Sequence, residues 1–93
     1  EIQEGQGVPI EINGLKLAIF LVNGIYYCID ELCTHAQVSL CEGEICGNEV
    51  LCPLHMASFS LITGEATAPP AYDPVQTYET RVTNGIIEIK INN

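Results

Sequence analysis

Two short segments each place a cysteine just before a histidine, and they contain both histidines of the chain. One residue separates Cys33 from His35, and two residues separate Cys52 from His55. A thiolate and an imidazole this close together in a turn can bind the same metal centre, so two such turns supply two thiolates and two imidazoles. We therefore expect Cys33, His35, Cys52 and His55 to be metal ligands.

This donor set allows three kinds of metal site. Structural zinc binds two cysteines and two histidines tetrahedrally. A mononuclear copper or iron site is a second alternative, although two thiolates suit it less well. The third is a two-iron cluster with both cysteines on one iron and both histidines on the other. The ligand order differs from that of a typical zinc finger, because each segment here contributes one cysteine and then one histidine.

The elements that must position these ligands are strands joined by tight turns. Asn-Gly occurs at positions 13–14, 23–24 and 84–85, each time between apolar residues. Because Asn-Gly readily adopts the positive φ values of a type I′ turn, each pair predicts a hairpin. Alternation of apolar and polar residues predicts half-buried strands, and continuous apolar runs predict buried ones. The strands expected in this way cover 8–12, 15–22, 25–30, 43–45, 49–52, 58–62, 75–83 and 87–91.

No segment shows a convincing helical period, so we expect an all-β fold, an antiparallel β sandwich or barrel. Three segments lack a strand pattern. Residues 31–41 contain Cys33 and His35, residues 53–57 contain His55, and residues 66–74 are rich in proline and are expected to be irregular. Acidic residues near these loops, Asp30, Glu31 and Asp73, are interpreted as solvated surface charges.

Length, charge and cysteine content narrow the class of protein. A chain of 93 residues suits one compact domain, spanning residues 1–93. Its net charge of −9 argues against nucleic acid or anionic membrane as a partner, and favours either solubility alone or an acidic face for a basic protein. Apolar runs are too short for a transmembrane helix, and no signal peptide is visible after Glu1.

The chain has five cysteines, of which three lie outside the paired segments. An odd number beside a substantial apolar content argues against a secreted disulfide scaffold. We expect Cys28 to be an ordinary buried thiol, and Cys41 and Cys46 to be free thiols. Metal binding in a reducing compartment, the cytoplasm, explains this cysteine content better than disulfides do. The protein is also expected to be a monomer.

At the paired segments the sequence resembles the Rieske ferredoxin family, and the resemblance covers nearly the whole chain. The matching segments are Cys33-Thr34-His35-Ala36, Cys52-Pro53-Leu54-His55, Phe59, Thr63-Gly64 and Pro69-Pro70-Ala71. The resemblance implies a β sandwich with a small cluster-binding subdomain at one tip, about residues 31–72, made of two loops plus a proline-rich loop.

The same resemblance implies one Rieske-type [2Fe–2S] cluster. Cys33 and Cys52 would bind the inner iron, and His35 and His55 the outer iron near solvent. The proline-rich loop would cover the cluster from a third side.

Within the family, the chain resembles the soluble ferredoxins of bacterial aromatic-ring-hydroxylating dioxygenase systems. Respiratory members have an extra cysteine in each loop, and Val38 and Leu54 stand at those positions here. The implied function is to pass single electrons from a flavin reductase to a terminal oxygenase, without catalysis by this chain. Two alternatives remain at this point. The chain could be a Rieske domain or small subunit of a larger oxidoreductase, such as a nitrite reductase or oxygenase, or a structural zinc module.

Overall fold

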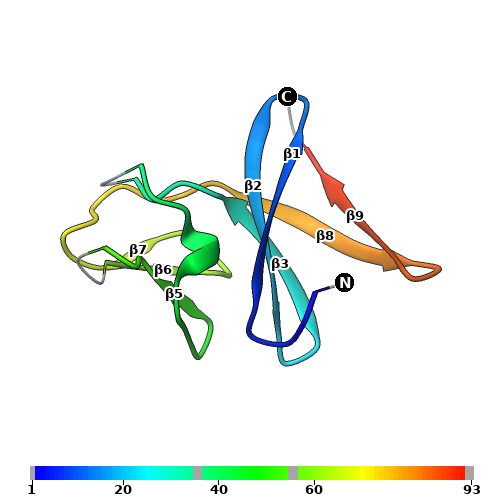
Figure 1. Ribbon diagram of the computed structural model, residues 1–93, viewed down its shortest axis with the longest axis horizontal. Helices are drawn as coiled ribbons and strands as arrows, with labels where there is room; N and C mark the ends of the chain where they lie inside the picture. Colours follow the sequence, from blue (N-terminus) through cyan, green and yellow to red (C-terminus); the bar gives the residue numbers. More distant parts are fainter. Residues whose placement is uncertain (1, 35–36, 55–56, 92–93) are drawn as a thin grey trace.

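Two antiparallel sheets make up the fold of the computed structural model, which describes residues 2–34, 37–54 and 57–91 (Figure 1). This architecture confirms the predicted all-β class. The larger sheet has the order β1-β2-β3-β8-β9, formed by β1 (Gly7–Ile12), β2 (Leu15–Val22), β3 (Ile25–Asp30), β8 (Thr77–Thr83) and β9 (Ile86–Lys90). The smaller sheet contains β4 (Ile45–Cys46), β5 (Glu49–Leu51), β6 (Ser58–Ser60) and β7 (Ala66–Ala68), and a 3₁₀ turn, η1 (Leu40–Glu42), precedes it. None of the helical segments in the described ranges is long and apolar enough to cross a membrane.

All three Asn-Gly pairs form two-residue hairpin turns, as predicted. The strand partners Ile12 and Leu15 flank the first turn, and equivalent pairs flank the other two. Both residues of each turn have positive φ, for example 52° at Asn13 and 83° at Gly14. These are the values that a type I′ turn requires, so the turns fix the register of β1 with β2, β2 with β3, and β8 with β9.

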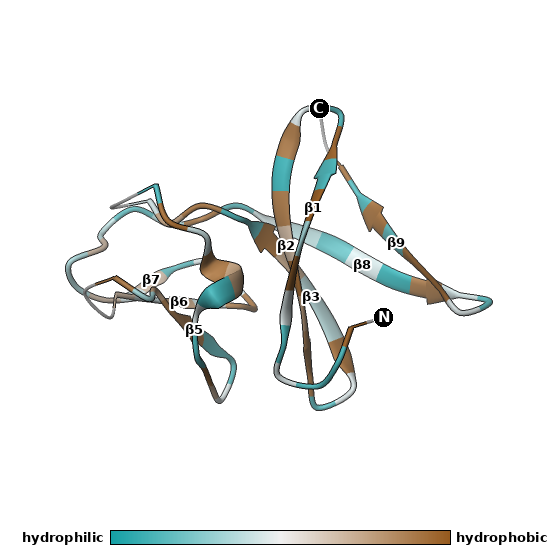
Figure 2. Cartoon of the chain, viewed as in Figure 1, coloured by the Kyte–Doolittle hydropathy of each residue, from teal (hydrophilic) through white to brown (hydrophobic). Residues whose placement is uncertain are grey.

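Strand β2 is buried on both faces, which explains its continuous apolar run. Leu17 and Ile19 pack with Cys28 inside the curled five-stranded sheet. Ala18 and Phe20 point the opposite way, into the core that joins the two sheets. Strand β9 instead alternates between exposed and half-buried residues, and Figure 2 shows both apolar and polar residues along it.

The prediction that residues 66–74 are entirely irregular is wrong at its start. Ala66–Ala68 form β7, paired with β6 through Ser58 and Phe59. The hydroxyls of Ser58 and Thr67 lie 2.6 Å apart and add a side-chain hydrogen bond to this pairing. The prolines begin only at Pro69, so they end the strand and do not prevent it. The predicted strand over 43–45 is displaced to Ile45–Cys46, because Gly43 ends η1.

Asp30 joins the end of β3 to the beginning of β8, so its interpretation as a solvated surface charge is wrong. Its carboxylate accepts hydrogen bonds from the backbone N–H of Gln76, at 3.0 Å, and from the hydroxyl of Tyr78, at 2.9 Å. Its own N–H donates to the carbonyl of Gln76, also at 3.0 Å. Burial, and then this contact with Asp30, raises the pKa of Tyr78 to about 12, so the hydroxyl remains a donor.

Gly64 holds the β6–β7 turn against the chain that leads into β8. Its N–H donates to the carbonyl of Ser60, at 2.8 Å, and its carbonyl accepts from Val75, at 2.9 Å. Its φ is +82°, and an added Cβ would lie 2.1 Å from the carbonyl oxygen of Val75. Gly85 has a similar φ of +78° but has open space around the Cβ position.

We predict that Gly64→Ala destabilises the protein more than Gly85→Ala does. Both substitutions incur a left-handed backbone penalty of about 1–2 kcal/mol. Only Gly64→Ala adds a collision with backbone, for which we expect a further cost of about 1–3 kcal/mol. Urea unfolding of the two variants measures the difference, and equal free energies of unfolding would contradict this role of Gly64.

Candidate metal centre

The two loops that contain the predicted ligands are closed by the same backbone hydrogen bond. The N–H of Cys33 donates to the carbonyl of Val38, at 2.9 Å, and the N–H of Cys52 donates to the carbonyl of Ala57. In both loops the donor is the cysteine and the acceptor lies five residues later. The similarity between the two sequence segments is therefore matched by equivalent backbone closures.

These closures bring the sulfur atoms of Cys33 and Cys52 together in the core between the sheets. The side chains are 1% and 0% exposed, and the two thiols are hydrogen-bonded to each other. Burial raises the pKa of the Cys52 thiol, and the contact with Cys33 raises it further. The backbone N–H of Leu54 acts in the opposite direction, because it donates to the Cys52 sulfur and lowers this pKa. The site therefore offers two adjacent sulfur donors shielded from water.

The proline-rich loop is hydrogen-bonded to the first cysteine loop and contributes to the core that contains both cysteines. The hydroxyl of Thr34 donates to the carbonyl of Asp73, at 2.8 Å, directly beside Cys33. Ala71 is 3% exposed and belongs to the same core cluster as Cys33 and Cys52. This placement supports the expectation that the loop covers the site from a third side. This bond is not predictable from the sequence, since a threonine in a turn carries no sign of which acceptor it will meet.

The two predicted histidine ligands, His35 and His55, lie outside the described residues. Within the described ranges, no group of three or more His, Cys, Asp or Glu side chains is arranged to hold a metal ion. What the structure brings together from the predicted set is thus the sulfur pair, Cys33 and Cys52.

The three other cysteines are free thiols, as predicted. Cys28 is 1% exposed and lies on the opposite side of β2 from the sulfur pair, in the second core cluster. Cys41 is half-buried within η1, and Cys46 is exposed on β4. Burial, and then the charge of Asp30, raises the pKa of Cys28 to about 12.

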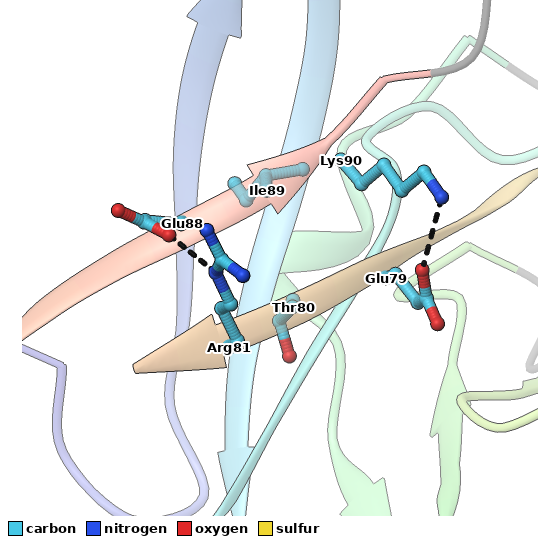
Figure 3. Close-up of a pocket in the computed structure, with 6 residues that line it drawn as sticks. All are labelled: Glu79, Thr80, Arg81, Glu88, Ile89 and Lys90. Carbon is cyan, nitrogen blue, oxygen red and sulfur yellow. Dashed lines mark hydrogen bonds and ion pairs between the residues drawn. The ribbon is translucent and has the colours of Figure 1, made fainter. Parts of the chain in front are cut away.

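A hollow on the β8–β9 hairpin is lined by charged side chains but, unlike the site around the sulfur pair, includes no cysteine (Figure 3). Its charges are paired across the two strands. Arg81 Nε lies 2.5 Å from Glu88 Oε1, and Lys90 Nζ lies 3.9 Å from Glu79 Oε1. Both pairs are largely exposed, so their contribution to stability is small. The hairpin is therefore electrically neutral.

A family model described as the Rieske [2Fe-2S] domain matches residues 1–79. The chain belongs to the Rieske [2Fe–2S] family. Its cofactor is accordingly a Rieske-type [2Fe–2S] cluster, which confirms the predicted cofactor and decides against zinc and mononuclear sites. The buried sulfur pair fits this group, because a Rieske centre has two thiolate ligands on one of its two irons.

Two relatives and one solved structure show which Rieske proteins this chain is similar to. A Ralstonia sp protein, the ferredoxin component of naphthalene 1,2-dioxygenase/salicylate 5-hydroxylase systems, is 34% identical over 98% of this chain and 88% of its own length. The 3-phenylpropionate/cinnamic acid dioxygenase ferredoxin subunit of Shigella flexneri is 38% identical over 98% and 86%. A complex of reduced oxygenase and oxidized ferredoxin in carbazole 1,9a-dioxygenase matches with a TM-score of 0.90 and 27% identity, over 97% of this chain and 93% of that chain.

We predict that Cys28 resists alkylation in the folded protein well below pH 12, whereas Cys46 reacts. The thiolate is the nucleophile, and with a pKa of about 12 roughly one Cys28 thiol in a thousand is ionised at about pH 9. Iodoacetamide labelling of the native protein, followed by peptide mass mapping, measures both rates. Labelling of Cys28 as fast as Cys46 would show that the buried thiol is accessible and ionised.

Proposed function

We propose that this protein is an electron carrier that takes single electrons from a flavin reductase and delivers them to the terminal oxygenase of an aromatic-ring-hydroxylating dioxygenase system. The observation that carries this proposal is the buried, hydrogen-bonded pair of Cys33 and Cys52 at two equivalently closed loops of a Rieske chain. Relatives that are ferredoxin components of dioxygenase systems support the oxygenase as electron acceptor. In this proposal the protein is a cytoplasmic monomer and does not itself catalyse hydroxylation.

The proposed cluster ligands are Cys33, His35, Cys52 and His55. The proposed domain organisation is a single Rieske domain over residues 1–93, with a cluster-binding subdomain over about 31–72. Strands β4 to β7 and both cysteines all fall within that range, which supports the assignment.

The residues around the sulfur pair prepare it to bind iron. When bound, a Rieske cluster takes up and releases one electron at a time. Burial of Cys33 and Cys52 keeps water from the sulfurs, and the Leu54 N–H stabilises the thiolate form of Cys52. Ala57 and Phe59 are fully buried in the same core and have no side-chain donor, so within the described part of this loop the donor to Cys52 is the backbone N–H of Leu54.

We predict that Cys33→Ser, Cys52→Ser, His35→Ala and His55→Ala each abolish cluster binding. Each change removes one of four ligands, and the chain has no further histidine as a substitute. Purified protein should lose iron, sulfide and the visible absorption of the cluster. Cys28→Ser and Cys46→Ser are matched controls that should keep all three. Loss of the spectrum in Cys46→Ser, with retention in Cys33→Ser, would contradict the ligand assignment.

We also predict that reduction by the flavin reductase slows as salt is added. The net charge of −9 attracts a basic partner over distances that salt screens beyond about 8–10 Å. Stopped-flow measurement of the second-order rate constant should show a severalfold fall between low and high ionic strength. A rate that stays constant or rises would exclude electrostatic steering, while leaving the cluster assignment intact.

A further inference from the structure

We propose that Asn13 and Asn84 are sites of spontaneous deamidation. The third Asn-Gly pair, Asn23-Gly24, is protected from the same reaction by the carboxylate of Glu4. This inference concerns the chemical lifetime of the chain and does not depend on the proposed electron-transfer function. It is drawn from three turns of equal geometry, of which only one, in the described part of the chain, has a side chain bound to its backbone N–H groups.

The three Asn-Gly turns contain the groups that deamidation uses. The backbone nitrogen of the glycine attacks the side-chain carbonyl carbon of the asparagine before it. A new C–N bond forms, the bond to the side-chain nitrogen breaks, the proton of the glycine nitrogen passes to the leaving group, and ammonia departs. Water then opens the resulting five-membered imide to aspartate or isoaspartate. Glycine favours the attack, because it has no side chain to block its nitrogen.

Local backbone geometry does not distinguish the three turns. The φ values are 52°, 53° and 53° at the asparagines, and 83°, 78° and 78° at the glycines that follow them. All of these residues are exposed, so water reaches each turn. Around each of the three glycines, the position of an added Cβ has open space. Any large difference in reactivity must therefore come from contacts that other residues make with the turns.

The second turn has such a contact. One oxygen of the Glu4 carboxylate accepts a hydrogen bond from the backbone N–H of Asn23, and the other accepts from the N–H of Gly24, at 3.3 Å. Within residues 2–34, 37–54 and 57–91, no side chain accepts from the N–H groups of the other two turns. The nitrogen of Gly24 is the nucleophile of the reaction, so at this turn its proton is shared with a negative charge.

A carboxylate at this position opposes the attack in two ways. It disfavours loss of the proton from the Gly24 nitrogen, because the nitrogen anion would lie beside a like charge. It also holds two consecutive N–H groups of the turn, and hydrogen bonds to a charged acceptor are stronger than neutral ones. These bonds must break before the backbone can rearrange toward the asparagine side chain.

Glu4 is itself held against the end of β2. The N–H of Gln6 donates to the carbonyl of Gln3, at 3.0 Å, which closes a turn around Glu4. The N–H of Gly5 donates to the carbonyl of Leu21, at 2.7 Å. Figure 1 shows this N-terminal segment at the end of β2 opposite to the first Asn-Gly turn. The backbone that carries the Glu4 carboxylate is therefore fixed beside the β2–β3 turn.

The test follows the loss of each asparagine amide in the holoprotein during incubation at mildly alkaline pH. Digestion at acidic pH with peptide mass mapping measures the three rates, and labelling by isoaspartyl methyltransferase detects isoaspartate. We expect Asn13 and Asn84 to deamidate about threefold to tenfold faster than Asn23, as for the loss of a charge-assisted hydrogen bond. Glu4→Ala should raise the Asn23 rate to that of the other two. Glu65→Ala, which removes another exposed carboxylate, should change none of the rates.

The order of the rates in the wild type needs no substitution, so the proposal can be tested even if Glu4→Ala does not fold. Equal rates at all three asparagines in the wild type would overturn it, and so would an Asn23 rate that Glu4→Ala leaves unchanged. Intact amides at Asn13 and Asn84, after a time in which unfolded protein loses them, would overturn both modification sites. Equal rises at all three sites in Glu4→Ala, with loss of the visible spectrum, would show general unfolding and overturn the specific role of Glu4.

Discussion

Two sulfur atoms from separate loops can share one buried position only if the strands beneath them hold those loops in register. Cys33 follows β3 of the larger sheet, and Cys52 follows β5 of the smaller one. The core that joins the sheets includes both cysteines together with Phe20 and Phe59. The distance between the two sulfurs therefore depends on how the sheets pack, because any shift of one sheet against the other also separates the ligands.

The segments that enter and leave the loop region, the end of β3 and the start of β8, lie side by side. Hydrogen bonds hold both segments in place. Asp30, the last residue of β3, is hydrogen-bonded to Gln76, which lies just before β8. Val75 is tied in turn to Gly64 of the smaller sheet. These bonds connect the two ends of the loop region to each other and to both sheets. Loops without regular structure can hold ligands in fixed positions when rigid elements anchor their ends. Here both ends of the loop region are anchored to the sheets.

Local sequence signals predicted what local physics determines. Asn-Gly pairs specified three turns, and period-two patterns specified the long strands, since both depend on residues close in the chain. Ala66–Ala68 were assigned wrongly because three following prolines suggested irregular chain, whereas the pairing with β6 is a tertiary contact. The role of Asp30 was missed for the same reason, as its partners lie more than forty residues away.

The sequence allowed the candidate ligand residues to be predicted, but not the groups that surround and contact them. A cysteine beside a histidine, repeated once, identified the loops from the sequence. The N–H of Leu54 was not predictable in this way, because every residue except proline has a backbone N–H and only the fold aims one at a sulfur. The same holds for the Thr34 hydroxyl and the Asp73 carbonyl.

The placement of charge follows a similar logic. Two of the three basic side chains, Arg81 and Lys90, face Glu88 and Glu79 across the β8–β9 hairpin. Exposed pairs of this kind contribute little to stability, so their main physical effect is on the electrostatic potential around the protein. They cancel charge at one end and leave the excess of acids on the rest of the chain, six of them between residues 31 and 73. An approaching basic protein thus meets a potential that differs between the two ends, and the more negative end is the one that contains the sulfur pair.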